Sequence, residues 1–341
     1  MYRCLQLAQK GAGDVAPNPM VGAVLVYNNT IIGEGFHQQY GQAHAEVNCI
    51  NNVTAANKGL IPKSTLYVSL EPCAHFGKTP PCADLIIKNS IPKVVIGCRD
   101  SYKEVAGKGI EKLKAAGVEV MVGILENKAL DLNKRFFTFH EKQRPYIILK
   151  WAQSKDKKIG STENKRIFIS NAITNRLVHQ WRGEEAAIMV GTNTALQDDP
   201  SLTTRLVTGK NPVRLVLDMD LKLPATLHLF DGSVTTLVFN KVKEEANGQL
   251  LFCKINANES IIPQILTTLY QQKIQSVIVE GGAKLLQSFI DAGIWDEARV
   301  ITNANLEIGN GVAAPQLKNY RSIQQQILDT DTIDYFLNDS F

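Results

Sequence analysis

Apolar and polar positions in the first half of the chain follow two alternating patterns. Short apolar runs bounded by turn residues predict strands, and apolar positions spaced three or four residues apart predict helices. The pattern predicts a helix over residues 2–10, followed by a hairpin whose two-residue turn is Asn28-Asn29. Further strands are predicted over Thr65–Leu70, Lys93–Cys98 and Val118–Val122, after the hairpin strands Val21–Tyr27 and Thr30–Glu34, with helices over Ala43–Asn51, Pro81–Lys88 and Ile110–Ala116. This alternation indicates a layered α/β domain.

A polar stretch at Glu141–Pro145 ends this pattern and precedes a new apolar run. A chain of 341 residues is too long for one average domain, so we expect two domains, 1–144 and 145–341. The second half again alternates strands with helices and is therefore also α/β. Its predicted strands are Tyr146–Trp151, Ala186–Val190, Val213–Leu217 and Ser276–Glu280, and its predicted helices are Ala172–Trp181 and Ala283–Asp291.

Composition is that of an ordinary globular protein, with 44% hydrophobic and 21% charged residues. The formal net charge is only +4 and the basic residues are scattered, which argues against a dedicated nucleic-acid binder but permits small anionic substrates. There is no apolar run of about 18 residues and no targeting leader. The sequence therefore predicts a cytoplasmic protein with no membrane partner, whose six cysteines are reduced.

Three residues of the first domain form a candidate zinc site: His44, Cys73 and Cys82. Catalytic zinc sites have three protein ligands and keep the fourth position for water, which the metal acidifies toward neutrality. That water can attack a ring carbon that bears an amino group. Glu46, two residues after the histidine, is the candidate general acid/base that moves a proton to the departing ammonia. Both cysteines are expected near helix starts, where the helix dipole favours a thiolate.

The spacing of the two cysteines departs from the usual deaminase signature, in which Pro-Cys-x-x-Cys follows His-x-Glu. Here eight residues, 74–81, separate Cys73 from Cys82, and their glycine and prolines predict a loop. Such a loop could place His75 and Lys78 over a substrate, although an ordinary solvated loop is the alternative. Asn18, between two prolines, could read a pyrimidine edge with its amide or could simply stabilise a rigid turn.

Simpler explanations compete with the zinc hypothesis. A His-Ala-Glu triplet arises by chance, and two cysteines can be buried thiols or part of a structural zinc site. The presence of all the elements in the right order favours the catalytic interpretation. The other four cysteines, Cys4, Cys49, Cys98 and Cys253, show no partner pattern and are expected in the core.

The second domain gives weak signals when its residues are taken alone. Glu280-Gly281-Gly282 lies between a predicted strand and a predicted helix and could cradle a phosphate, but a glycine pair there is as often a packing feature. Asp198-Asp199-Pro200 with Arg205 offers charged groups near a turn, and a surface turn explains it equally well.

Several motifs together resemble the bifunctional deaminase/reductase family of riboflavin biosynthesis. In the first domain the resemblance lies in 16–24, 32–35, 44–47, 70–82 and 105–110, and it includes the eight-residue loop between the cysteines. In the second domain it is looser and lies in 150–154, Arg182, 190–194, 198–205, 279–282 and 295–297. The resemblance implies a cytidine-deaminase-like three-layer α/β domain followed by a dihydrofolate-reductase-like α/β domain.

The resemblance also implies function and site residues. The family deaminates a pyrimidine that carries a phosphoribosylamino group and then reduces the ribosyl group to ribityl with NADPH, so Zn²⁺ and NADPH are the expected cofactors. It implies substrate contacts for Asn18, His75, Lys78, Arg182, Leu202, Arg205 and Glu280, and dinucleotide contacts for Ala152, Phe168, Thr194, Asp198, Gly281 and Gly282. A homo-oligomer is a family-based expectation.

Two departures from the family pattern bear on the reductase. The family has Ser-Leu-Asp-Gly where this chain has Ser154-Lys155-Asp156-Lys157, so a position tolerant of positive φ is lost and the loop is expected to close differently. Phe168 replaces a common tryptophan and loses its indole N–H. Two other hypotheses remain: another zinc nucleobase deaminase with a degenerate or regulatory nucleotide-binding domain, and a non-catalytic zinc module fused to a nucleotide sensor.

Overall fold

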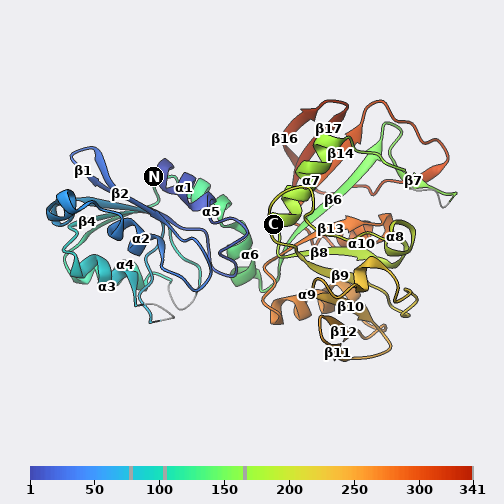
Figure 1. Cartoon of the computed structure of the whole chain (residues 1–341), viewed down its shortest axis with the longest axis horizontal. Coiled ribbons are helices and arrows are strands. Elements are labelled where there is room, and N and C mark those ends of the chain that lie inside the picture. Colours follow the sequence, from blue (N-terminus) through green and yellow to red (C-terminus); the bar gives the residue numbers. More distant parts are fainter. Residues whose placement is uncertain (77–79, 103–105, 164–166, 340–341) are drawn as a thin grey trace. The chain divides into compact units, whose positions relative to one another are not determined.

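The computed structural model describes residues 1–76, 80–102, 106–163 and 167–339. The chain divides into two compact units, Met1–Gln143 and Arg144–Phe341, which are described in turn (Figure 1). Within the described residues, no helix combines the length and apolar character that crossing a membrane requires.

The first unit is built on one mixed sheet of five strands in the order β2-β1-β3-β4-β5. Strand β1 pairs antiparallel with β2 and β3, whereas β3, β4 and β5 are parallel. Its elements are α1 (Tyr2–Gln9), β1 (Gly22–Tyr27), β2 (Thr30–Phe36), α2 (Ala45–Asn51), the 3₁₀ helix η1 (Ala55–Lys63), β3 (Thr65–Leu70), α3 (Cys82–Lys88), β4 (Lys93–Cys98), α4 (Lys108–Ala115), β5 (Glu119–Val122), α5 (Glu126–Leu132) and α6 (Lys134–Lys142).

Helices cover both faces of this sheet and make a three-layer domain. One hydrophobic cluster joins the sheet to α2, α3 and α4, and another joins it to α1, α5 and α6. The predicted hairpin turn is confirmed, because Asn28 and Asn29 both adopt left-handed φ values, 48° and 61°, as a two-residue hairpin turn with native twist requires. The buried strands β3 and β4 place their carboxyl ends beside the starts of the helices that follow, where functional side chains gather.

The second unit is built on a sheet of ten strands in the order β11-β12-β10-β9-β8-β13-β6-β14-β17-β16. The run from β12 to β14 is parallel, and β11, β17 and β16 are antiparallel additions at its ends. Its elements are β6 (Tyr146–Ser154), β7 (Lys158–Ser161), α7 (Ala172–Glu184), β8 (Ala187–Gly191), α8 (Thr192–Asp198), β9 (Val213–Leu217), the 3₁₀ helix η2 (His228–Phe230), β10 (Thr236–Asn240), β11 (Glu245–Asn247), β12 (Leu250–Lys254), α9 (Ile261–Gln271), β13 (Ser276–Gly281), α10 (Ala283–Asp291), β14 (Glu297–Asn303), β15 (Gly311–Ala313), β16 (Tyr320–Leu328) and β17 (Asp331–Asn338).

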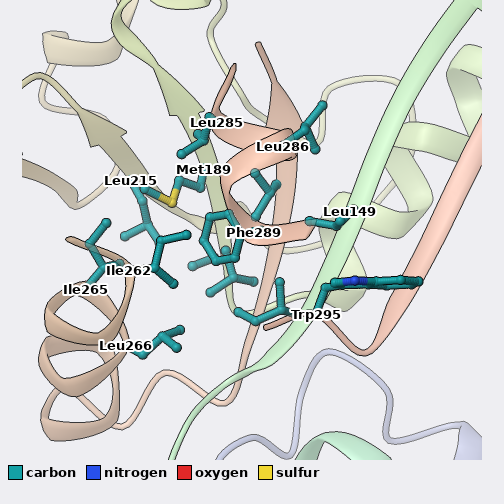
Figure 2. Close-up of a cluster of buried hydrophobic side chains, with 14 of the residues drawn as sticks. Leu149, Met189, Leu215, Ile262, Ile265, Leu266, Leu285, Leu286, Phe289 and Trp295 are labelled. Atoms are coloured by element: carbon teal, nitrogen blue, oxygen red, sulfur yellow. The ribbon is translucent and has the colours of Figure 1, made fainter. Parts of the chain in front are cut away.

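Both faces of the second sheet carry a hydrophobic core. Figure 2 shows one core, in which Phe289 and Leu286 of α10 pack with Ile265 of α9 and with Leu149 and Met189 of the sheet. The opposite face packs against α7 and the start of the loop after α8, including Leu202. A parallel sheet buried on both faces brings the carboxyl ends of β6, β8 and β13 to one edge, which is where open α/β sheets bind ligands.

Some predicted boundaries need correction. The helix predicted over Ala43–Asn51 begins at Ala45, because His44 is extended and acts as its N-cap residue. The helix predicted from Pro81 begins at Cys82, with Pro81 as N-cap residue. The helix predicted over Ala172–Trp181 continues to Glu184. The pattern did not predict α5, α6, α8, α9, β7, β10, β11, β12, β14, β15, β16 or β17.

Candidate functional site

The three predicted metal ligands meet in the first unit although the outer two, His44 and Cys82, are 38 positions apart in the sequence. Their ligand atoms all lie within 4.8 Å of one another, with His44 Nδ1 3.6 Å from Cys73 Sγ and 3.3 Å from Cys82 Sγ. Tetrahedral zinc with bonds of about 2.0–2.3 Å holds neighbouring ligand atoms about 3.5 Å apart. The donor set and its spacing therefore fit zinc, and three ligands leave the fourth position for water.

The two cysteines differ in their relation to the helices. Cys82 is the first residue of α3, as expected, but Cys73 lies in a loop and begins no helix, which corrects the prediction for that residue. The start of α3 nevertheless faces Cys73, because the backbone N–H of Cys82 donates to Cys73 Sγ at 3.3 Å. Hydrogen bonding from Cys82 lowers the pKa of the Cys73 thiol, which favours the thiolate that a metal needs.

Glu46 lies in the first turn of α2, two residues after His44, and is 3% exposed. Its Oε2 atom has no hydrogen-bond partner among the described residues, an unusual state for a buried carboxylate oxygen. Burial raises the pKa of Glu46 to about 7. A carboxyl group that can gain or lose a proton near neutral pH, with a free oxygen beside the metal ligands, suits a general acid/base.

Asn18 is held by a histidine that the sequence analysis overlooked, His37. The ring of His37 is 2% exposed and lies 5.5 Å from that of His44. Its Nδ1 is 3.0 Å from the carbonyl oxygen of Ala43, which can only accept, so Nδ1 carries the proton. A neutral ring then accepts at Nε2 from the Asn18 amide nitrogen 3.1 Å away. This orientation leaves the amide oxygen of Asn18 available for a ligand, since no described residue hydrogen-bonds to it.

A second overlooked residue, Glu71, supports the loop that carries Cys73. Its carboxylate is 4% exposed and accepts four backbone N–H bonds, at 3.0–3.3 Å. The donors are Asp100, Gly107, Gly109 and Ile110. A Cβ atom at Gly109 would lie 1.9 Å from the carbonyl oxygen of Pro72, so glycine is required there. Glu71 thus joins the start of α4 to the residues directly before a metal ligand.

His75 follows Cys73 by two residues and is half-buried, and its Nδ1 has no partner among the described residues. Its ring lies 6.4 Å from that of Tyr102, which in turn lies 4.9 Å from that of His140. Lys78 lies outside the described residues. The predicted loop therefore contains one imidazole nitrogen that can bind a ligand, next to an aromatic ring.

The second unit contains a buried charge cluster between the middle of β6, the carboxyl end of β13 and helix α7. Arg182 of α7 donates to both carboxylate oxygens of Glu280 at 2.7 Å, and Lys150 Nζ is 3.5 Å from the same carboxylate. Burial opposes ionisation of Glu280, but the two cations outweigh it and lower its pKa to about 2. The sequence analysis predicted Arg182 and Glu280 as substrate contacts and missed their mutual ion pair and the lysine.

The other two predicted substrate contacts of this unit lie in the loop after α8. Leu202 is 2% exposed, packs in the hydrophobic cluster under α7, and has a left-handed φ of 50°. A branched residue in that conformation is strained, and such strain is concentrated at functional sites. Arg205, three residues later, is exposed and therefore accessible to an anionic group.

Among the predicted dinucleotide contacts, Thr194 and the two glycines lie together. A Cβ atom at Gly281 or Gly282 would lie 3.1 Å from Thr194 Oγ1, so the backbone there approaches the threonine closely and precedes α10. Ala152 lies near the end of β6 and Asp198 ends α8. Phe168 is 76% exposed. The glycine pair at a helix start offers the backbone N–H groups that a dinucleotide phosphate requires, so these residues fit such a cofactor.

The loop that departs from the family pattern contains a turn, in which the backbone N–H of Lys157 donates to the carbonyl oxygen of Ser154. Lys157 adopts a left-handed φ of 57°, although lysine is less tolerant of it than glycine. Asp156 fixes the loop by accepting from the Ser154 hydroxyl and from the backbone N–H groups of Ile308 and Gly309. Lys157 therefore adopts a backbone conformation that glycine tolerates better, and the change in loop closure stays a prediction.

Two family models match the chain. Residues 1–98 match the cytidine and deoxycytidylate deaminase zinc-binding region, and residues 145–332 match the RibD C-terminal domain. The predicted fold class, a cytidine-deaminase-like α/β domain followed by a dihydrofolate-reductase-like α/β domain, is confirmed.

Curated relatives cover nearly the whole chain. The riboflavin biosynthesis protein RibD of Aquifex aeolicus is 38% identical over 337 residues, which cover 96% of this chain and 92% of the relative. RibD of Bacillus amyloliquefaciens is 41% identical over 326 residues, or 93% of this chain and 86% of the relative.

A solved structure from Thermotoga maritima is similar over 99% of this chain and 97% of its own, with a TM-score of 0.90 and 35% identity. That protein is described as a diaminohydroxyphosphoribosylaminopyrimidine deaminase/5-amino-6-(5-phosphoribosylamino)uracil reductase. The chain belongs to the RibD family and is a bifunctional enzyme of riboflavin biosynthesis, with a zinc deaminase domain and an NADPH-dependent reductase domain.

Proposed function

We propose that the domain spanning 1–144 deaminates 2,5-diamino-6-(5-phosphoribosylamino)pyrimidin-4-one and that the domain spanning 145–341 reduces the ribosyl group of the product to ribityl. One observation carries the first step: a buried glutamate with a free carboxylate oxygen, Glu46, lies beside three converging zinc ligands. A purely structural zinc site has no use for such a group. This also argues against a non-catalytic zinc module.

In the deaminase site, His44, Cys73 and Cys82 hold the metal. Zinc, when bound, supplies the Lewis acid that makes water nucleophilic near neutral pH. Glu46 takes a proton from water and delivers it to the amino nitrogen, so that the C–N bond breaks and ammonia leaves as the ring carbon gains oxygen. Asn18 presents its amide oxygen to the N–H groups of the pyrimidine.

The same site must hold the phosphorylated sugar of its substrate. His75 and Lys78 suit that role, because an imidazole nitrogen and an ammonium group can donate to sugar and phosphate oxygens. His75 offers an Nδ1 atom without a partner among the described residues, which supports this assignment.

In the reductase site, NADPH supplies the hydride, and the protein supplies binding and orientation. We assign substrate contacts to Arg182, Leu202, Arg205 and Glu280. Because Glu280 occupies Nε and Nη2 of Arg182, the exposed Arg205 is better placed to bind the phosphate. The dinucleotide contacts are assigned to Ala152, Phe168, Thr194, Asp198, Gly281 and Gly282.

Replacing Glu46 tests the deaminase assignment. The Glu46→Gln variant should keep one zinc per chain but lose ammonia release by roughly 10²- to 10⁴-fold, because only the proton-transfer group is changed. Metal analysis and an ammonia assay on the aminopyrimidine measure both quantities. Reduction of independently deaminated substrate serves as the control for folding. Ammonia release at the wild-type rate would refute the role of Glu46.

Oxidation of NADPH tests the second step. Its absorbance should fall only when deaminated substrate is present. An intact deaminase without that oxidation would instead support the alternative, a zinc nucleobase deaminase with a degenerate or regulatory second domain. Chromatography on the full chain tests the expected homo-oligomer, and cell fractionation tests the expected cytoplasmic location.

A further inference from the structure

His179 is a buried histidine of the reductase domain whose role is not explained by packing. It lies on α7, three residues before Arg182, and is 4% exposed. Its Nδ1 atom is fully shielded and has no hydrogen-bond partner among the described residues. A buried polar atom without a partner destabilises the fold, so a leucine would serve better if packing were the only role.

The position of α7 places His179 toward the ligand-binding edge of the sheet. The helix starts at the carboxyl end of β14, where Asn303 donates to the carbonyl of Ile169, and it ends three residues before β8 begins. It therefore runs antiparallel to the strands. An α-helix rises about 4.5 Å over three residues, so His179 lies nearer than Arg182 to the edge of the sheet formed by the carboxyl ends of the strands. Open α/β sheets bind their ligands at that edge.

Four charged groups act on the ring: Lys150, Arg182, Arg205 and Glu280. Three are cations and one is an anion, so the surroundings are positive. Burial, together with Arg182 and Arg205, lowers the pKa of His179 to about 4. The imidazole is therefore neutral at physiological pH, with one nitrogen that donates and one that accepts.

A neutral donor/acceptor pair does not match a phosphate group, which the neighbouring cations bind better. It matches a hydroxyl group, which also donates and accepts. Glu280 is already satisfied by Arg182 and Lys150, so it does not compete for the ring. The ribosyl chain of the substrate carries several hydroxyl groups and must reach this site for reduction.

We propose that His179 is a substrate-binding residue of the reductase, whose free ring nitrogen hydrogen-bonds to a hydroxyl of the ribosyl chain. This inference rests on the proposed function of the second domain. His179 and Arg182 lie on the same face of α7, and His179 is about one turn closer to the edge of the sheet where the ligand enters. The proposal assigns recognition of the sugar to this face.

Two substitutions and one control test the proposal in the full-length, zinc-loaded chain. His179→Leu removes both ring nitrogens and fills the space, and His179→Gln restores a neutral hydrogen-bonding group. Gln180→Leu, on the exposed side of the same helix, is the matched control. The readouts are reductase kcat/KM and the dissociation constant of the ribityl product measured by calorimetry. Ammonia release reports that the first domain is intact.

We expect His179→Leu to lower reductase kcat/KM and product affinity by roughly tenfold to a hundredfold, because a substrate hydroxyl is left unpaired. His179→Gln should recover part of the loss, and Gln180→Leu should change neither quantity. The thermal stability of His179→Leu should equal or exceed that of the wild type, which separates binding from structural damage.

The result that overturns the proposal is product affinity within twofold of the wild type in His179→Leu, or equal losses in the Gln180→Leu control. Failure of the proposed function looks different, since the wild type itself would then not oxidise NADPH with deaminated substrate. Product affinity needs no turnover, so it decides the role of His179 in either case.

Discussion

The carboxylate of Glu71 offers a quantitative test of how the deaminase site is held in place. The Glu71→Gln substitution keeps the size and shape of the side chain but replaces one accepting oxygen with an NH₂ group. In the wild type, Oε2 accepts from Asp100 and Gly107, and Oε1 accepts from Gly109 and Ile110. Whichever way the amide turns, two backbone N–H groups face a donor and lose their acceptor.

Each buried N–H group left without an acceptor costs about 1–3 kcal/mol. Two such groups give a loss of about 2–6 kcal/mol, and the contact lengths of 3.0–3.3 Å favour the lower half of that range. A typical domain is stable by only about 5–15 kcal/mol, so the loss is easily measured. Because Glu71 lies two residues before Cys73, zinc affinity should fall with it.

Urea denaturation of the zinc-loaded chain should therefore show an earlier unfolding transition for the first domain and an unchanged transition for the second. Hydrogen exchange should accelerate at the two amides that lose their acceptor, which are those of Asp100 and Gly107 or those of Gly109 and Ile110. Glu119→Gln provides a control, because Glu119 is 62% exposed in its ion pair with Lys93 and should change stability by less than about 0.5 kcal/mol. A loss below 1 kcal/mol with unchanged exchange would refute this account of Glu71.

Two further predictions concern the reductase domain. The cations around Glu280 lower its pKa to about 2. The ionised carboxylate therefore contributes its full stabilisation of the folded domain above about pH 4.5, and this contribution is lost as the pH falls through 2. The Glu280→Gln substitution should lower the free energy of unfolding by about 3 kcal/mol at pH 7 and should make it nearly independent of pH between pH 5 and 2. If urea denaturation gives both proteins the same dependence of the unfolding free energy on pH, this prediction is wrong. The Lys157→Gly substitution should raise the free energy of unfolding by about 0.5–1 kcal/mol, because glycine tolerates the φ of 57°. Thermal unfolding at a lower temperature than in the wild type would show that Lys157 is not strained.

The deaminase ligands could be predicted because each belongs to a short local pattern. His44 and Glu46 are two residues apart at the start of one helix, and Cys73 and Cys82 bracket one loop. Local turn chemistry also predicted the Asn28-Asn29 hairpin. The exact starts of α2 and α3 could not be predicted, because they depend on which residue caps each helix after folding.

The supporting residues of both sites could not be predicted in the same way. His37 binds Asn18 across 19 residues, and Glu71 binds backbone groups 29–39 residues away. Glu280 and Arg182 are 98 residues apart. No short pattern encodes such pairs, because they form only when β13, β6 and α7 have assembled. The antiparallel edge of the second sheet was missed for a different reason, since β16 is largely polar and exposed and lacks a clear alternation.

The contrast between the two sites follows from what each buried carboxylate must stabilise. Glu71 accepts from backbone N–H groups, so it fixes the path of the chain and, through Pro72, the position of a metal ligand. Glu280 instead pairs with Arg182 and Lys150, so it fixes side chains and sets the charge of the surroundings. Burial and the nearby cations Arg182 and Arg205 keep His179 neutral by lowering its pKa, and a neutral imidazole can recognise a sugar hydroxyl where a cation would compete with arginine for phosphate. By holding Arg182 and Lys150 in place, Glu280 therefore keeps two of the cations that lower the pKa of His179 in the reductase site.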